Sequence, residues 1–221
     1  MTTTIILVDD QELLRMGFRL VLDSQPDLEV IAEAADGREA MTLVAEHAPD
    51  IVLMDVRMPD VDGVTATREI IASGSASRII ILTTFDLDEY AYAALRAGAS
   101  GFLLKDAPPA DLLSAIRAVA SGDSVVAPST TRRLLETIAH RLPGAGDLGD
   151  HAALATLTPR EREVVGAVAR GLSNAEIAAQ LVLAEATVKT HIGRILAKLE
   201  LRDRVQIVVF AYDHGLVHGA T

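Results

Sequence analysis

The first half of the chain alternates between short apolar runs and segments in which apolar residues recur at helical spacing. The apolar runs have the length of strands and are Ile5–Val8, Leu28–Ala32, Ile51–Met54, Ile79–Leu82 and Phe102–Leu104. The helical segments between them are Leu13–Leu22, Arg38–Ala45, Thr65–Ile71, Tyr90–Leu95 and Leu112–Val119. Strands that are each followed by a helix predict a parallel sheet with helices on both faces. We therefore expect an α/β unit over residues 1–122, with a flavodoxin-like, doubly wound five-stranded sheet in the order 2-1-3-4-5.

The pattern loosens after this unit. Ser129–His140 has helical spacing, and the Pro and Gly residues of Leu142–Gly149 are typical of a flexible linker, so we expect a linker with a helix over residues 123–154. Gly144–Gly149 also matches the pattern GxGxxG. A dinucleotide-binding loop of that pattern follows a strand and opens a helix, whereas a predicted helix precedes this one. The match therefore indicates a linker and not a nucleotide site.

Residues 155–221 contain no strand signal and several signals for helix starts. Two capping boxes, each with a capping hydroxyl and a Glu three positions later, are Thr158-Pro159-Arg160-Glu161 and Ser173-Asn174-Ala175-Glu176. Further helices are predicted from about Ala184 to Leu199 and from about Arg202 to His214. We expect a small all-α unit of four helices, in which Ser173–Leu181 and Ala184–Leu199 form a helix-turn-helix.

Composition and charge refine this division. The chain has 221 residues, half of them hydrophobic, and no cysteine, which excludes disulfides and thiolate metal sites. It has no apolar stretch near the roughly 18 residues that span a bilayer, so we expect a cytoplasmic protein without a membrane partner. The net charge is −11, but residues 1–125 carry 21 acidic and 9 basic side chains, whereas residues 156–221 carry 7 and 8. This difference indicates two units with different partners.

Polar groups stand at four strand ends of the first unit. Asp9 and Asp10 end the first strand and Asp55 ends the third, and these strands flank the switch point where ligands bind in such sheets. Carboxylates that converge there need a cation, and oxygen ligands suit Mg²⁺. Thr83 and Lys105 end the fourth and fifth strands. A single Asp at a strand end often only caps a helix, but this combination indicates phosphoryl transfer through an aspartyl phosphate.

At these residues the chain resembles the receiver domains of two-component response regulators over about residues 3–120. The resemblance rests on Asp9-Asp10, Leu53-Met54-Asp55-Val56-Arg57-Met58-Pro59, Leu82-Thr83 and Gly101-Phe102-Leu103-Leu104-Lys105. It implies that Asp55 accepts a phosphoryl group from a sensor histidine kinase. It also implies that Asp10, Asp55 and the backbone carbonyl of Arg57 hold Mg²⁺, with Asp9 acting through water.

The same resemblance implies a conformational switch. Lys105 would pair with the phosphoryl group, Thr83 would reorient to hydrogen-bond it, and Phe102 would move inward when Thr83 shifts. Because Phe102 is not a Tyr, it has no hydroxyl to exchange partners. Asp106 follows Lys105 where some receivers have Pro, so no cis-proline is expected there.

Residues of about 155–218 resemble the LuxR-type DNA-binding domain. The matching segments are Leu157–Val164, Gly171–Ala178, Ala186–Ile192 and Lys198-Leu199. With the receiver, they make the chain similar to the NarL/FixJ subfamily. The resemblance implies that Lys189 and Thr190 face bases and that Arg194 and Lys198 lie near phosphates, whereas His191 contacts the DNA backbone or packs within the helix. Two departures are Ala184, which lacks a capping side chain at a cost of ~1 kcal/mol, and Gly193, which shifts base contacts toward Lys189 and Thr190.

The resemblance implies a promoter-binding transcriptional regulator that forms a homodimer when phosphorylated. It is expected to accept a phosphoryl group and to be capable of hydrolysing its own aspartyl phosphate, but not to be a metabolic enzyme. Two alternatives are an enzyme of the haloacid-dehalogenase type and a DNA-binding or scaffold protein that does not need phosphorylation. The enzyme requires an Asp two residues after the nucleophile, where Arg57 stands. The second alternative usually loses part of the acidic site, which is complete here.

Overall fold

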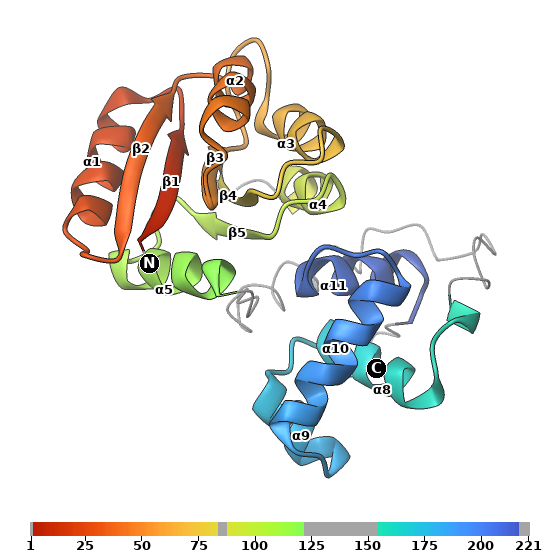
Figure 1. The fold of residues 1–221 in the computed structure, drawn as a ribbon. Coiled ribbons are helices and arrows are strands. Elements are labelled where there is room, and N and C mark those ends of the chain that lie inside the picture. Colours follow the sequence, from red (N-terminus) through yellow and green to blue (C-terminus); the bar gives the residue numbers. More distant parts are fainter. Residues whose placement is uncertain (1, 84–87, 122–153, 217–221) are drawn as a thin grey trace. The chain divides into compact units, whose positions relative to one another are not determined.

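The computed structural model describes residues 2–83, 88–121 and 154–216, drawn as coloured ribbons in Figure 1. The chain divides into two compact units, residues 1–125 and 126–221. The predicted helix Ser129–His140 and the GxGxxG match at Gly144–Gly149 lie outside the described residues. Among the described residues, no helix combines the length and the apolar character needed to cross a membrane.

The first unit is a parallel sheet with helices on both faces, as the sequence predicts. Its strands are β1 (Thr3–Val8), β2 (Leu28–Ala34), β3 (Ile51–Asp55), β4 (Arg78–Thr83) and β5 (Gly101–Leu104). They pair in parallel in the order β2-β1-β3-β4-β5, which confirms the predicted topology. The helices are α1 (Glu12–Asp23), α2 (Gly37–His47), α3 (Gly63–Ala72), α4 (Asp88–Arg96) and α5 (Pro109–Ala120).

The two faces of the sheet explain why its strands are continuous apolar runs. Alternate residues such as Ile5 and Leu7 pack with Leu22 of α1 and Ile116 of α5 in one buried cluster. Figure 1 shows α1 and α5 on one side of the sheet and α2, α3 and α4 on the other. Residues on both faces of β3 are buried, because each face is covered by helices.

The second unit is a helical domain, as predicted. It contains α8 (Pro159–Ala169), α9 (Asn174–Leu181), α10 (Glu185–Lys198) and α11 (Arg204–Asp213). Both predicted capping boxes are present, with Thr158 at α8 and Ser173 at α9. Ala184 gives α10 no side-chain cap. The helices enclose one apolar core that includes Val164, Val168, Ile177, Val188, Ile195 and Ile207.

Candidate functional site

Three carboxylates meet where β1 and β3 end. These strands are neighbours, with Val8 opposite Met54, so Asp9 and Asp55 leave the sheet at the same edge. Oxygen atoms of Asp9, Asp10 and Asp55 all lie within 4.8 Å of one another. Asp9 and Asp55 are 1% and 3% exposed, whereas Asp10 is exposed. The predicted convergence of the three carboxylates is therefore present, with one open side.

Lys105 joins this group from the end of β5. Its Nζ lies 2.7 Å from Asp9 Oδ2 and 2.8 Å from Asp55 Oδ2, and its side chain is almost fully buried. The backbone N–H of Lys105 donates to the carbonyl of Thr83 at 2.7 Å, which extends the β4–β5 pairing to the site. The Lys105 ammonium therefore forms ion pairs with two buried carboxylates.

Burial and charge act in opposite directions on these groups. Burial raises the pKa of the Asp55 carboxyl, and the nearby Lys105 ammonium opposes this only in part. Burial by itself lowers the pKa of Lys105, but its bonds to Asp55 and Asp9 outweigh burial, so the pKa is raised overall. The Lys105 ammonium is therefore protonated at neutral pH. A further cation beside Asp55 would act like Lys105 and oppose the effect of burial on the Asp55 pKa.

The donor set fits a hard divalent cation. Asp9 Oδ2 is buried and has its ion pair with Lys105 but no hydrogen-bond partner in the described part of the chain. Asp55 Oδ1 accepts the backbone N–H of Arg57 at 3.3 Å, which brings the Arg57 backbone to the same rim. Carboxylate and carbonyl oxygens are the ligands that such ions prefer, and the exposed Asp10 leaves room for water.

Thr83 and Phe102 occupy the neighbouring strands. Thr83 is the last residue of β4 and is 3% exposed. Phe102 lies on β5 opposite Ile81, and its side chain is 7% exposed. The aromatic side chain that the sequence comparison assigns to the switch is therefore already buried in this structure.

Gly63 is a supporting residue that the sequence analysis did not identify. A Cβ atom on Gly63 would lie 2.1 Å from the backbone oxygen of Asp55 and 3.0 Å from the Cα of Val56. Its N–H donates to the carbonyl of Val56 at 3.1 Å. A side chain at position 63 would collide with the backbone of Asp55, which cannot turn aside as a flexible side chain can. The segment that carries Asp55 can therefore follow its observed path only because residue 63 is glycine. The Asp62-Gly63 pair at the helix start is the available sequence signal.

Arg15 and Gln11 connect α1 to the site and were also not predicted. The N–H of Gln11 donates to Asp9 Oδ1 at 2.9 Å. Arg15 Nη1 donates to the backbone carbonyl of Asp9 at 2.5 Å, while its Nε pairs with Glu33 at 3.3 Å. The start of α1 is thus bonded to Asp9, through contacts that span only two and six residues of the sequence.

In the second unit, α10 carries the residues that the sequence assigns to DNA. Lys189, Thr190 and Arg194 are exposed on this helix, while Val188 and Ile195 are buried in the core. The hydroxyl of Thr190 donates to the carbonyl of Ala186 at 2.9 Å.

Two other candidate residues lie differently. His191 is half-buried, and its Nδ1 is buried with no hydrogen-bond partner in the described part of the chain. Lys198 donates from Nζ to Glu161 Oε2 at 2.6 Å and to the carbonyl of Thr156 at 3.2 Å. Together with the backbone N–H of Thr158, this ammonium lowers the pKa of Glu161 to about 2. The charge of Lys198 is therefore engaged in fastening α10 to the start of α8.

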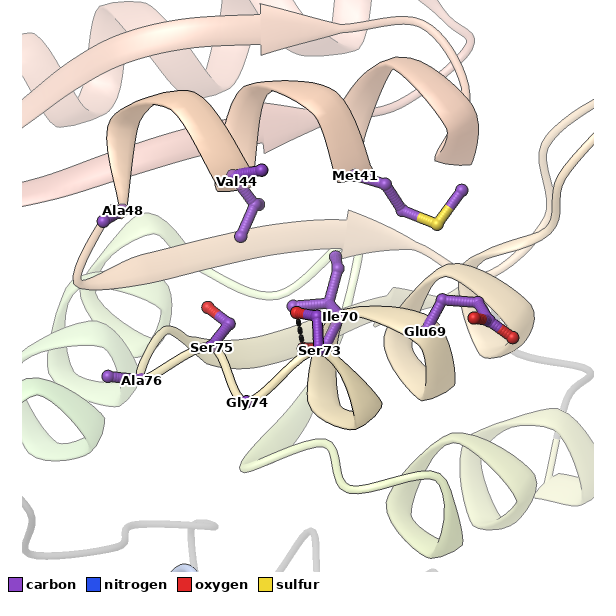
Figure 2. A pocket seen from close by; sticks show the side chains of 10 residues that line it. Met41, Val44, Ala48, Glu69, Ile70, Ser73, Gly74, Ser75 and Ala76 are labelled. Carbon is purple, nitrogen blue, oxygen red and sulfur yellow. Dashed lines mark hydrogen bonds between the residues drawn. The ribbon is translucent and has the colours of Figure 1, made fainter.

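A hollow of about 520 Å³ lies elsewhere, between α2 and α3 (Figure 2). Its lining includes Met41 and Val44 of α2, Ile70 of α3 and Ser75 in the turn that follows. None of the candidate residues lines it. The lining residues Ala48 and Ala76 precede β3 and β4, so the hollow lies toward the edge of the sheet opposite the acidic site.

Comparisons with known proteins identify both units. Residues 5–117 match the family model of the response regulator receiver domain, and residues 155–211 match that of the luxR family of bacterial regulatory proteins. The chain belongs to the response regulators that join a receiver domain to a LuxR-type DNA-binding domain, which are transcriptional regulators of two-component systems.

Similar proteins align over nearly the whole chain. The transcriptional regulatory proteins YxjL and LiaR of Bacillus subtilis are 43% and 39% identical, over 96% and 97% of this chain and 96% and 99% of their own lengths. The response regulator VraR of Staphylococcus aureus is 38% identical over 98% of this chain and its full length. Among solved structures, response regulator ChrA of a heme-sensing two-component system is 35% identical, with a TM-score of 0.53, and covers 98% of this chain and 99% of its own. The predicted family is thereby confirmed.

Proposed function

We propose that Asp55 is the phosphoryl acceptor through which a sensor histidine kinase controls this regulator. The observation that carries the proposal is the buried Lys105 ammonium, which bridges Asp9 and Asp55 at 2.7 and 2.8 Å. An Asp55 oxygen attacks the phosphorus of a phosphohistidine, and the bond to the imidazole nitrogen breaks. Lys105 then pairs with a phosphoryl oxygen, and the Thr83 hydroxyl turns to donate to another. Phe102 is already buried, and the shift of Thr83 would hold it in this inward position.

The proposal includes Mg²⁺ as the cofactor. Asp10, Asp55 and the backbone carbonyl of Arg57 would hold it, with Asp9 linked through water. When bound, Mg²⁺ neutralises charge on the transferring phosphoryl group. The three carboxylates, which lie close together and of which Asp9 and Asp55 are buried, support a cation at this place.

The receiver is proposed to span residues 1–122, followed by a linker over residues 123–154 and the DNA-binding domain over residues 155–221. The exposed face of α10 supports base contacts from Lys189 and Thr190 and a phosphate contact from Arg194. His191 packs in the helix or contacts the DNA backbone. Lys198 lies at the end of the same helix; its exposed ammonium is proposed to lie near a phosphate while it also pairs with Glu161.

Phosphorylation is proposed to act by favouring a homodimer in the cytoplasm. Two half-sites bound together give helix-turn-helix domains useful affinity. The second unit is nearly neutral and the first is strongly acidic, so a single copy gains little from charge on DNA. Dimerisation therefore supplies affinity that charge does not.

Asp55→Asn tests the acceptor, with Asp60→Asn as the matched control. Asp60 is exposed and has a φ of 60°, a left-handed conformation that Asn accepts readily. Incubation with a small phosphodonor and Mg²⁺ should shift wild type and Asp60→Asn on a phosphate-affinity gel, raise their dimer fraction and tighten promoter binding. Asp55→Asn should do none of these. If Asp55→Asn dimerises and binds DNA like phosphodonor-treated wild type, the protein works without phosphorylation and the proposal is wrong.

A further inference from the structure

The hollow between α2 and α3 extends along about two turns of α2 (Figure 2). Four residues of this segment line it at intervals of three and four positions, which places them in one stripe: Met41, Val44, Ala45 and Ala48. Over these seven residue steps a helix rises about 10 Å. The volume of about 520 Å³ is typical of sites that bind small molecules. The hollow therefore has the length and the volume to hold one small organic molecule.

The packing of the two helix starts fixes α2 beside α3. The N–H of Gly37, the first residue of α2, donates to the carbonyl of Val61 at 3.1 Å. A Cβ atom on Gly37 would lie 2.6 Å from that carbonyl oxygen and 2.9 Å from the Cβ of Ala66 on α3. The helices thus meet closely at their starts, and the hollow lies beside their later turns. Because Ala45 and Gly74 are small, their side chains leave the hollow unfilled.

The inner wall of the hollow is apolar. Val44 and Ile70 are 4% and 3% exposed and point toward each other from the two helices (Figure 2). Met41 lies at one end, with a flexible thioether side chain that adapts to an aliphatic chain or to the edge of an aromatic ring. We therefore expect the occupant to have an apolar body.

The formal charge and the helix dipoles along the hollow are all negative. The carboxylate of Glu69 is exposed and lies at the same end as Met41 (Figure 2). Both helices end at the hollow, since their cap residues Ala48 and Ser73 line it, and a helix carries partial negative charge at this end. In the part of the chain that the structure describes, no basic residue lines the hollow. A charged occupant should therefore be a cation.

We propose that this hollow is a binding site for a small organic cation, an amine or amidine on an apolar body about 10 Å long. The cationic group pairs with Glu69, and the apolar body lies along Val44 and Ile70 toward Ala48. An anion would meet the Glu69 carboxylate and the negative ends of two helices, whereas a neutral molecule would lack the ion pair. The inference concerns the unphosphorylated receiver, so it does not depend on the proposed role of Asp55.

Three probes that share one body and differ in their head group test the sign of the charge. Phenylbutylamine is a cation at neutral pH, phenylbutanol is neutral and phenylbutyrate is an anion. In NMR titrations of the full chain at constant ionic strength, the amine should shift the backbone amides of Ala45 and Ile70. The alcohol should bind roughly fivefold more weakly, and the anion more weakly still. Equal affinity for amine and alcohol, or no binding of the amine at millimolar concentration, would overturn the proposal.

Paired variants test the residues of the site. Glu69→Gln should lower the affinity for the amine roughly fivefold and leave that for the alcohol unchanged. Its control is Glu29→Gln, which removes an exposed carboxylate of β2 and should bind the amine like wild type. Ala45→Leu should abolish binding because it fills the hollow, whereas Ala72→Leu makes the same change at an exposed position of α3 outside the lining. If Glu69→Gln binds the amine as tightly as wild type, the proposal is wrong.

The acidic site of the same unit is the other place that could attract the amine. Repeating the titration in millimolar Mg²⁺, at the same ionic strength, separates the two places. Binding in the hollow should keep its affinity and its shifts in α2 and α3. Displacement of the amine by Mg²⁺, with shifts confined to the surroundings of Asp9 and Asp55, would refute a site in the hollow. Amide spectra that match wild type away from the substitution confirm that each variant is folded.

Discussion

At the scale of single residues, Lys105 pairs with two buried carboxylates, those of Asp9 and Asp55. Lys105→Met keeps the length of the side chain but removes the charge. Breaking a buried pair costs about 3 kcal/mol, because the partner charges stay buried. We expect the first unit to lose roughly that much unfolding free energy in urea titrations without Mg²⁺, and to recover part of it when millimolar Mg²⁺ is added. A variant as stable as wild type would show that the two carboxylates do not depend on this ammonium.

Val182 is a second residue whose environment makes a clear prediction. It ends α9 with a φ of 54° and is 90% exposed. A left-handed conformation costs a residue with a Cβ about 1 kcal/mol, and the cost is higher for a branched side chain, whereas Gly adopts it freely. Val182→Gly should therefore raise the unfolding free energy of the second unit by about 0.5–1 kcal/mol, measured by thermal unfolding. Val182→Ala keeps the Cβ and should give little of this gain.

At the scale of helices, the contact between α8 and α10 depends on Glu161. Its pKa is lowered from 4.5 to about 2, first by the bond from Lys198 and then by the backbone of Thr158. A carboxyl group with a lowered pKa in the folded state stabilises that state above its unfolded pKa and loses this effect as the pH falls through the folded value. The contribution of Glu161 should thus be complete above about pH 5 and lost near pH 2.

Glu161→Gln should reveal this contribution in calorimetry of the full chain. We expect the second unit to lose about 2 kcal/mol at pH 7, the usual worth of a hydrogen bond to a charged group. The difference from wild type should shrink as the pH falls from 5 to 2.5. Glu163→Gln is the control, since Glu163 is half exposed and pairs with Arg160 on the same helix. An equal loss at pH 7 and pH 2.5 would mean that the charge of Glu161 is not what matters.

The sequence predicted every strand and helix of the first unit but not where the helices begin. The expected helix at Thr65–Ile71 begins at Gly63, after Asp62 caps it by accepting the N–H of Thr65. The helix expected from Leu112 begins at Pro109. The first turn of α3 begins with Gly63 and that of α5 with Pro109, so apolar spacing gives a weak signal there and the caps determine where the helices begin.

The sequence predicted those residues of the candidate site that stand at the ends of strands, but not the residues that reach the site from loops and helices. Asp9, Asp55 and Lys105 follow buried strands, and the parallel order brings such ends to one edge. The contact of Gly63 with the Asp55 backbone depends on how a loop packs, and this is not encoded in any local spacing. The engagement of Lys198 by Glu161 likewise joins residues 37 positions apart. The sequence alone therefore does not show whether a basic side chain on this helix pairs with DNA phosphates or with an acidic residue of its own domain.

At the scale of the whole molecule, the charge distribution sets how the protein should depend on salt. The affinity for DNA falls with salt by a slope of about −0.9 per phosphate contact. Arg194→Gln removes one proposed phosphate contact from each copy, so the slope for a dimer on two half-sites should become shallower by about 2. Thr190→Ala should lower affinity for the specific sequence and leave the slope unchanged. Fluorescence anisotropy across a salt series measures both, and equal slopes for wild type and Arg194→Gln would remove Arg194 from the phosphate contacts.

The sharing of one ammonium between Asp9 and Asp55 has a consequence for how the receiver responds to its inputs. In the proposed function, a phosphoryl group on Asp55 would compete with Asp9 for Lys105, and the buried Asp9 would then need another cation. Phosphoryl group and divalent ion should therefore bind cooperatively, and by thermodynamic reciprocity each strengthens the other by the same factor. In the proposed function, the receiver would therefore respond fully only when the phosphoryl group and the metal ion are present together, and the phosphoryl group alone would leave the buried site with excess negative charge.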